Sequence, residues 1–390
     1  MSLDFDSARL PNRDLTEEHH AWRTQLRRFI DDEVMPHAGD WDEAGDIPGW
    51  LWTRAAELGL LGLGYPEQYG GVSDGIDIWF HNIVNEELAR LGVGGVAATL
   101  MVHNIGLPPV VNFASEAVRE RVAPPVLAGE AHISLAITEP GGGSDVASLS
   151  TTAVQDGDHF VVNGSKTYIT GGMRANWFST AVRTGGEGAG GVSMLLIDAD
   201  APGVSRTELV RKQGWWASDT ATIYFEDVRV PVSQLIGERE QGFKVIMNNF
   251  NSERLAMAVG MEAMARVCLE EAVEWARERK TFGKRLADHQ VIRHKVAQMK
   301  QRLNATQGYL QLVSQQYEDG NVDAGDMALL KVQASETVEF CAREAMQILG
   351  GAGYFRGSRI ERIYREVRVN AIGGGSEEIM RDLAARQYRF

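Results

Sequence analysis

The residue best suited to do chemistry is Glu253, because the sequence places its carboxylate on an apolar face of a predicted helix. Counted at about 100° per residue, the apolar neighbours on that face are Ile246, Phe250, Met257 and Met264. Burying a carboxylate is costly unless it is paired or functional, and loss of water would raise its pKa toward that of a general base. Periodicity leaves two interpretations open: a catalytic base, or an interface glutamate that pairs with its neighbour Arg254.

Three glycine-rich segments could let the backbone approach a ligand. Residues 138–145, Thr-Glu-Pro-Gly-Gly-Gly-Ser-Asp, follow a predicted strand but match neither a Walker loop nor a dinucleotide turn, so a surface loop is the simplest interpretation. Residues 372–380 lead from Ile-Gly-Gly-Gly into a helix that Ser376 would cap, and amides at such a helix start can stabilise an anion or a developing oxyanion. Residues 347–353, Gln-Ile-Leu-Gly-Gly-Ala-Gly, are typical of a helix C-cap.

Two further segments combine turn signals with aromatic or basic side chains. Asn163-Gly164 is a candidate tight turn, and Tyr168 and Thr170, two apart on the strand that follows, would share one face and could press on a flat ligand. Ordinary sheet packing is the simpler explanation of that pair. Residues 278–285, Glu-Arg-Lys-Thr-Phe-Gly-Lys-Arg, either offset a helix dipole or hold a pyrophosphate.

Composition and charge argue against several other functions. The 390 residues carry 39 basic and 53 acidic side chains, a net charge of −14, so we do not expect nucleic acid as a partner. Cys268 and Cys341 lie in helical patterns without metal-ligand spacing and the nine histidines form no ligand set, so we expect no metal site. The sequence has no signal-peptide pattern and no stretch near the ~20 apolar residues of a membrane helix, which predicts a cytoplasmic protein without membrane insertion.

The elements that must position these residues change character twice along the chain. Residues 1–132 have helical periodicity, residues 133–236 alternate as a mainly antiparallel β domain with a hairpin turn at Asp156-Gly157, and residues 237–390 return to long helices. The last region is expected to form a four-helix bundle from helices over 242–279, 290–319, 324–349 and 377–389. The predicted fold class is therefore α+β with three domains: N-terminal helical, middle antiparallel β and C-terminal helical.

Taken in order, the six chemical segments resemble those of the acyl-CoA dehydrogenase family of flavoproteins. Residues 65–71, Tyr-Pro-Glu-Gln-Tyr-Gly-Gly, and 225–231, Phe-Glu-Asp-Val-Arg-Val-Pro, extend the resemblance over almost the full length. It implies an oxidoreductase of fatty acid metabolism or β-oxidation, with FAD in a cleft between the β domain and the bundle and an acyl-CoA thioester against the flavin. It also implies a homo-oligomer, commonly a homotetramer, in which neighbouring subunits share each FAD.

The resemblance carries functional roles onto matching positions of this sequence. The residues that would bind FAD are Leu135, Ile137, Thr138, Gly143, Ser144, Tyr168, Ile169, Thr170, Arg279, Thr281, Phe282, His289, Gln290, Gln347, Ile348, Leu349, Gly350, Gly351, Ser376 and Glu378. The residues that would contact the acyl-CoA substrate are Ser144, Asn251, Arg254 and Gly375.

One departure from the commoner family pattern bears on mechanism. Many members carry the catalytic glutamate in the C-terminal loop, where this chain has Gly374, whereas a subset that includes long-chain and isovaleryl-type enzymes carries it on the helix. Ser-Glu-Arg-Leu at 252–255 matches that subset, so the resemblance assigns the base to Glu253. Glu253 would remove the α-proton of the thioester while the Gly374 N–H binds the carbonyl oxygen, and the β-hydrogen would pass as hydride to flavin N5.

The expected product is a trans-2-enoyl-CoA, with the electrons passing on to an electron-transfer flavoprotein. Two alternatives stay open: a flavin oxidase or monooxygenase of the same fold that uses oxygen, and a non-catalytic acyl-CoA-binding protein. The sequence does not reveal the acyl chain, although Gly373 in place of a bulky aromatic would widen the pocket for a branched or long chain.

Overall fold

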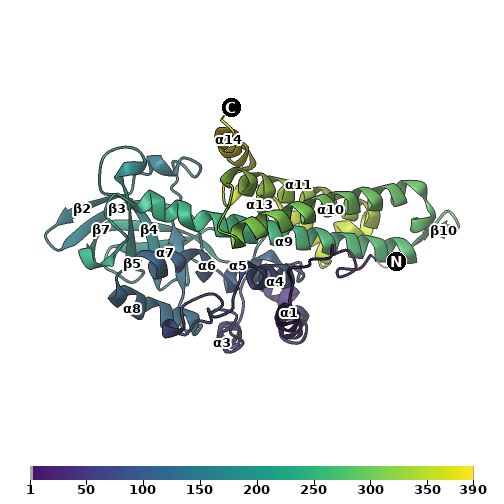
Figure 1. Cartoon of the computed structure of the whole chain (residues 1–390), viewed down its shortest axis with the longest axis horizontal. Coiled ribbons are helices and arrows are strands. Elements are labelled where there is room, and N and C mark those ends of the chain that lie inside the picture. The colour runs from purple at the N-terminus through teal and green to yellow at the C-terminus, as the bar shows by residue number, and fades with distance from the viewer. Residues whose placement is uncertain (1–2, 390) are drawn as a thin grey trace.

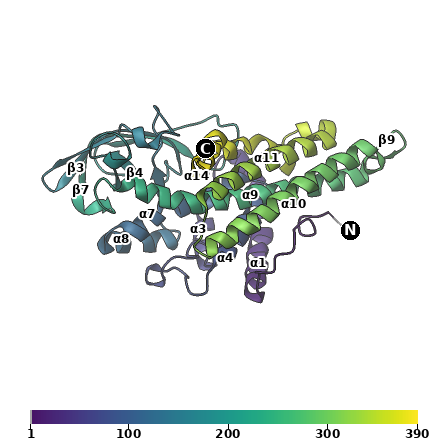
Figure 2. The ribbon, with the colours of Figure 1, turned by 45° about the horizontal axis from the view of Figure 1, so that its top comes forward.

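The computed structural model describes residues 3–389 as a helical region, a β-sheet and a set of long helices, in that order along the chain (Figure 1). The sheet lies at one end of an elongated molecule, and the long helices extend away from it. This arrangement confirms the predicted α+β fold class. Figure 2 shows the same layout with the N-terminal helices beneath the long ones.

The N-terminal region is built from short helices that pack on the rest of the molecule. They are α1 (Glu17–Phe29), α2 (Met35–Ala44), α3 (Trp50–Glu57), α4 (Ile78–Ala89), α5 (Gly94–Leu100), α6 (His103–Gly106), α7 (Pro108–Phe113) and α8 (Glu116–Leu127). Thr16 and His19 form a capping box at the start of α1. Helix α4 packs on the long helix α9 (Gly242–Glu278), and α6 contacts both α9 and the first strand of the sheet.

Within residues 3–389, eight strands form one mainly antiparallel sheet. They are β1 (Ile133–Ala136), β2 (Thr152–Asp156), β3 (His159–Thr170), β4 (Trp177–Arg183), β5 (Val192–Asp198), β6 (Val204–Glu208), β7 (Thr220–Pro231) and β8 (Leu235–Ile236). Their order is β6-β7-β3-β2-β4-β5-β8, and β1 pairs with β4 in parallel. The predicted hairpin at Asp156-Gly157 is confirmed, because Asp156 pairs with His159 across the β2–β3 turn.

The predicted tight turn at Asn163-Gly164 is wrong, because β3 runs straight through these residues. Gly164, with a φ of +146°, instead accommodates a register shift against β7. The Asn163 amide bonds across the sheet, donating to Asp227 Oδ1 at 3.0 Å and accepting the Asp227 N–H at 2.9 Å. A dipeptide that favours a tight turn can therefore form a β-bulge instead when a neighbouring strand, here β7, pairs with it.

The C-terminal region contains all four predicted helices and two short ones between them that the sequence did not suggest. Besides α9, they are α10 (Gln290–Glu318), α11 (Ala324–Leu349), α12 (Arg359–Glu366), α13 (Arg368–Ile372) and α14 (Glu377–Gln387). Helices α9, α10 and α11 pack against one another, and α14 packs on α11. The small hairpin β9 (Lys280–Thr281) and β10 (Lys284–Arg285) joins α9 to α10 at the end far from the sheet (Figure 1).

Helix α9 passes through two hydrophobic cores. Near its start, Val245 and Ile246 pack into a core shared with α8 and the sheet, whereas from Leu255 onward it belongs to the core of the long helices. Glu253 lies at the junction between these cores.

In the part of the chain that the structure describes, no single helix is long and apolar enough to cross a membrane, although the bent pair 94–100 and 103–113 reaches that length and composition together.

Candidate active site

Glu253 presents a carboxylate that the protein buries but does not pair. The side chain keeps some accessible surface, while its Oε2 atom is buried and has no hydrogen-bond partner within residues 3–389. Burial raises the pKa of Glu253 to about 7, and the positive charges of Arg254 and Lys331 oppose that rise. A carboxylate with these properties can accept a proton near neutral pH.

The sequence predicts that Arg254 either pairs with Glu253 or contacts the substrate. In the structure, its guanidinium instead hydrogen-bonds to the glycine loop and to Asn251. Its Nε donates to the Gly374 carbonyl at 3.2 Å and its Nη1 donates to Asn251 Oδ1 at 3.4 Å. Its guanidinium lies 5.5 Å from the centre of the Phe250 ring. Within the described residues, Arg254 therefore binds the glycine loop and makes no ion pair with Glu253.

The glycine loop, residues 373–375, packs on α9 near Glu253, and two of its positions favour glycine. Gly374 and Gly375 have φ angles of +66° and +103°, in the left-handed region that strains other residues. A Cβ at position 374 would lie 2.8 Å from Met257 Sδ, and one at position 375 would collide with Met380 Cε. Met257 follows Glu253 by one helical turn, so a side chain at position 374 would displace a methionine of the helix that carries the carboxylate.

The far side of this loop is held by α11 and α14. Lys331 Nζ donates to the Gly375 carbonyl at 2.7 Å, and Ser376 caps α14 as predicted by accepting the Ile379 N–H at 3.4 Å. We did not single out Lys331 from the sequence. The signal was present, because Lys331 interrupts the apolar run Ala328-Leu329-Leu330 in the same way that Glu253 interrupts its own face.

On the β-domain side, the residues expected to hold a flavin lie on β1, on β3 and in the loop after β1, and on the strands only Tyr168 is exposed, whereas Leu135, Thr138 and Thr170 are half-buried. Tyr168 is 71% exposed with a φ of +58°, at a register shift of β3 against β7 that interrupts regular strand alternation, while the neighbouring Ile169 is buried and Thr170 half-buried. The Thr138 carbonyl accepts the Thr167 N–H at 2.8 Å, which brings the loop after β1 beside Tyr168. An exposed ring flanked by hydroxyls suits a flat ligand with a polar edge.

The loop that follows β1 is anchored at Glu139, and its glycines are exposed. Glu139 accepts hydrogen bonds from Lys166 Nζ at 2.7 Å and from the Ser150 and Thr151 N–H groups at 2.6 and 2.8 Å. These bonds outweigh burial and lower the pKa of Glu139. Gly143 and Ser144 remain exposed beyond this anchor, so the surface-loop interpretation and a ligand-binding role are both compatible with their placement.

The remaining residues expected to bind FAD lie at the other end of the molecule. Arg279, Thr281, Phe282, His289 and Gln290 surround the hairpin between α9 and α10, roughly 40 Å along α9 from Glu253 at about 1.5 Å per residue (Figure 1). Gln347, Ile348, Leu349, Gly350 and Gly351 form the end of α11 and the turn after it, where Gly350 at φ +62° gives the predicted C-cap. One chain therefore does not bring the two groups of predicted FAD residues together.

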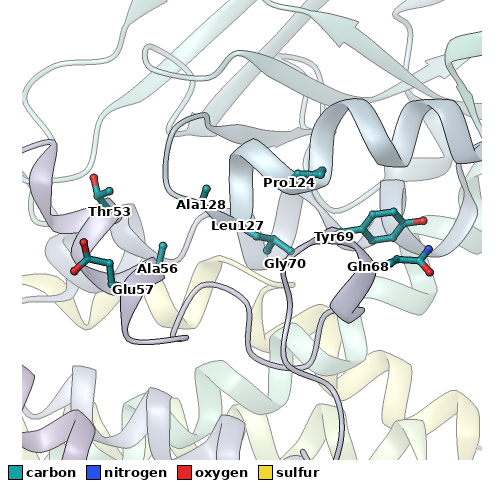
Figure 3. Close-up of a pocket in the computed structure, with 9 residues that line it drawn as sticks. All are labelled: Thr53, Ala56, Glu57, Gln68, Tyr69, Gly70, Pro124, Leu127 and Ala128. Atoms are coloured by element: carbon teal, nitrogen blue, oxygen red, sulfur yellow. The ribbon is translucent and has the colours of Figure 1, made fainter.

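A surface pocket of about 480 Å³ lies away from all of these residues (Figure 3). It is bounded by α3, the turn Glu67–Tyr69 and α8, and Tyr69 and Leu127 are among its lining residues. None of its lining residues was predicted to bind substrate or cofactor.

In residues 3–389 there is also no group of three His, Cys, Asp or Glu side chains arranged to hold a metal ion.

Comparisons with known proteins agree with this architecture. The family models for the N-terminal, middle and C-terminal domains of acyl-CoA dehydrogenase match residues 16–130, 134–228 and 240–388. The mitochondrial long-chain specific acyl-CoA dehydrogenase of Sus scrofa is 34% identical over 95% of this chain and 86% of that protein. The mitochondrial isobutyryl-CoA dehydrogenase of Bos taurus is 33% identical over 96% of this chain and 90% of that protein.

Among solved structures, a probable acyl-CoA dehydrogenase from Mycobacterium abscessus is 44% identical, with a TM-score of 0.93 over 96% of this chain and 99% of that one. The butyryl-CoA dehydrogenase of Megasphaera elsdenii is 28% identical, with a TM-score of 0.90. The similarity thus extends from the N-terminal helices through the sheet to α14. The chain belongs to the acyl-CoA dehydrogenase family, as its sequence motifs indicated.

Proposed function

We propose that this chain oxidises an acyl-CoA thioester between its α- and β-carbons to the trans-2-enoyl-CoA, with Glu253 as the base. The family supports dehydrogenation of an acyl-CoA in general, and one observation carries the assignment of the base. Glu253 Oε2 is buried without a hydrogen-bond partner in the described part of the chain, and its pKa is raised to about 7. The carboxylate is thus free to accept the α-proton, which the thioester carbonyl makes acidic.

The glycine loop supplies the complementary group for the carbonyl. The Gly374 N–H has no backbone acceptor within residues 3–389, whereas the Gly374 and Gly375 carbonyls are occupied by Arg254 and Lys331. We assign this N–H to the thioester oxygen, where it stabilises the charge that develops as the proton leaves. Phe250 and Met257 flank Glu253 on its helix and exclude water from the reacting carbons.

We assign FAD to the surface around Tyr168, because this exposed aromatic ring lies beside the half-buried residues Leu135, Thr138 and Thr170, which offer hydroxyls and strand backbone. When bound, FAD accepts the hydride that leaves the β-carbon. Ser144 and the capped start of α14, with Ser376 and Glu378, add polar groups toward the phosphates and the ring. An electron-transfer flavoprotein is the proposed electron acceptor.

We further propose that the active unit is a homo-oligomer, most simply a homotetramer. The residues at the hairpin between α9 and α10 would complete the FAD site of a neighbouring subunit. Large apolar side chains are exposed at this end of the molecule, where Phe282, Tyr354 and Phe355 are 97%, 82% and 73% exposed. Exposed aromatic side chains grouped in this way are typical of a surface that another chain covers.

Two observations bear on the acyl chain of the substrate. Relatives named for long-chain and isobutyryl substrates have about the same identity to this chain, so both classes belong in a test panel. Gly373 lacks the bulky side chain that would fill this position, where a Cβ would already lie 3.4 Å from the Val369 carbonyl oxygen and 4.0 Å from Met257 Cε. We propose a branched or long acyl group, and turnover restricted to short straight chains would contradict this.

An anaerobic titration tests the reaction and the base together. The purified flavoprotein is mixed with straight and branched acyl-CoAs while flavin absorbance is recorded, and Glu253→Gln and Glu274→Gln are run beside the wild type. Glu274 is an exposed glutamate on the same helix, so its variant should bleach like the wild type. Glu253→Gln should bleach about 10²–10⁴-fold more slowly, the usual contribution of a general base.

Other results would redirect the assignment. Bleaching of Glu253→Gln at the wild-type rate would exclude Glu253 as the base and turn attention to Glu377 and Glu378. A wild-type flavin that no panel member bleaches would favour a non-catalytic acyl-CoA-binding protein. Reduced enzyme that reacts faster with oxygen than with an electron-transfer flavoprotein would favour an oxidase or monooxygenase.

A further inference from the structure

Lys331 is a buried cation directly behind the glycine loop. The residue is fully buried in α11, and its Nζ donates to the Gly375 carbonyl at 2.7 Å. The charged groups that act on it come from every element packed around the loop: Glu253 and Arg254 on α9, Glu377 on α14, and Arg368 on α13. A buried ammonium that binds a neutral carbonyl needs an explanation, since burying an unpaired charge is costly.

Most of the charges around Lys331 are held by other partners. Glu377 accepts a hydrogen bond from Ser335 Oγ at 2.6 Å and an ion pair from Arg381 at 3.4 Å. Arg368 pairs with Glu339 at 2.6 Å, and Arg254 donates to the Gly374 carbonyl. Within the described residues, Lys331 has no ion pair, so its charge is directed at the loop and, beyond it, at the carboxylate of Glu253.

The two cations Lys331 and Arg254 hold consecutive carbonyls of the loop, those of Gly375 and Gly374. These two bonds fix the peptide groups 374–375 and 375–376, which directly follow the peptide that carries the Gly374 N–H. At the same time neither cation occupies Glu253 Oε2. A direct salt bridge would lower the pKa of the carboxylate by about 1–3 units and remove the free oxygen.

We propose that Lys331 is a positioning residue for proton abstraction: it fixes the glycine loop opposite Glu253 and holds a positive charge behind the carboxylate without pairing with it. The inference rests on the proposed role of Glu253 as base. Burial lowers the pKa of Lys331 to about 8, with Glu377 opposing that change, so most of the lysine is still charged at the pKa of Glu253. The positive charge keeps the base titrating near neutrality despite its burial.

The test measures the ionisation of Glu253 in the flavoprotein without turnover. The carboxyl infrared band of Glu253, identified by its absence in Glu253→Gln, is followed against pH in wild type and in Lys331→Met. Loss of the charge should raise the pKa of Glu253 by about half a unit to one unit. The acidic limb of kcat/KM should move to higher pH by the same amount, and this shift alone should lower kcat/KM at pH 7 about two- to fivefold.

Two further variants separate charge from packing. Lys331→Gln keeps a donor for the Gly375 carbonyl but no charge, so it should show the same shift in pKa with a smaller loss of rate. Ser335→Ala, one turn along α11, removes a buried hydrogen bond to α14 without changing charge, and should leave the pKa of Glu253 in place. Lys331→Gln also replaces Lys331→Met if the latter fails to fold, as judged by circular dichroism and retained flavin.

The outcomes distinguish this inference from the proposed function. An infrared titration of Glu253 that is unchanged in both lysine variants overturns the role of Lys331, even if activity falls, because a purely structural lysine would lower the rate without moving the pKa. Full activity in Glu253→Gln instead overturns the proposed base, whatever the infrared titration shows.

Discussion

At the scale of single residues, the site depends on Glu253, whose carboxylate is buried although no partner within the described residues offsets the loss of water. The ordinary pKa of a glutamate is 4.5, and burial raises that of Glu253 to about 7. Between these values only the folded state holds the proton, so Glu253 stabilises the fold below about pH 4.5 and loses that stabilisation as the pH rises through about 7.

We therefore expect Glu253→Gln to have a larger free energy of unfolding than the wild type. The difference between the two proteins should grow by about 2 kcal/mol from pH 5 to pH 8. A neutral amide at this position avoids the cost of desolvating a charge. Denaturant unfolding of both proteins at the two pH values, at equal flavin content, measures the margin. The same margin at both pH values would show that the pKa of Glu253 is not raised.

A second residue-scale prediction concerns Gly374, whose left-handed φ and contact with Met257 exclude a side chain. Gly374→Ala should lower the free energy of unfolding by about 1–2 kcal/mol and displace the loop from Glu253, with a loss of kcat/KM of about tenfold or more. Shortening Met257 in the same protein should restore part of the activity, because it removes the collision but not the backbone strain.

The control for this substitution is Gly186→Ala, in the loop before β5. A Cβ at Gly186 would meet nothing within 4 Å among the described residues, and its φ is not left-handed. This variant should match the wild type in stability and rate. If Gly374→Ala behaves in the same way, the loop does not require glycine there.

At the scale of elements, the loop after β1 is attached to β3 by the buried pair of Glu139 and Lys166. Their closest oxygen–nitrogen distance is 2.7 Å, and burial lowers the pKa of Lys166 to about 8 while Glu139 opposes that change. The attachment places the 138–145 segment beside Tyr168. The anchor thus links a structural ion pair to the edge that we assign to FAD.

Replacing one residue of this ion pair should lower the free energy of unfolding more than replacing both residues. Glu139→Gln leaves a buried ammonium unpaired and is expected to cost about 3–5 kcal/mol of stability and to weaken flavin retention. The double variant Glu139→Gln/Lys166→Met should recover most of that stability. A double-mutant cycle in denaturant measures the coupling, and additive losses would contradict the pairing.

At the scale of the whole molecule, the two groups of predicted FAD residues lie at opposite ends of α9 (Figure 1). Under the proposed function, this separation requires a neighbouring subunit to complete each FAD site. The side chain that should report most directly on that assembly is Phe282, because it is 97% exposed at the hairpin between α9 and α10.

Phe282→Asp should therefore shift the protein toward smaller species and lower its flavin content in parallel, since a charge would be buried where an aromatic ring packs. Mass photometry and the ratio of flavin to protein absorbance measure both effects. Val154→Asp provides a matched control, because Val154 is also exposed, at 65%, but lies on β2 in the sheet. A Phe282→Asp protein with unchanged mass would contradict the proposed interface.

Much of this protein follows from its sequence because the relevant signals are local. Periodicity located all four long C-terminal helices, turn chemistry located the β2–β3 hairpin, and a single acidic residue on an apolar face located Glu253. The same local signals failed at Asn163-Gly164, where a neighbouring strand turned a candidate turn into a bulge, and they did not indicate α12 and α13.

What the tertiary structure alone decided is which groups meet. Arg254 lies next to Glu253 in the sequence, yet it binds the carbonyl of Gly374, which is distant in the chain, and Lys331 approaches the same loop from a third helix. Sequence determines that a carboxylate will be buried at position 253, since hydrophobicity acts along a helix face. Whether that carboxylate is paired or free depends on long-range packing, where geometry, rather than proximity in the chain, selects the partners.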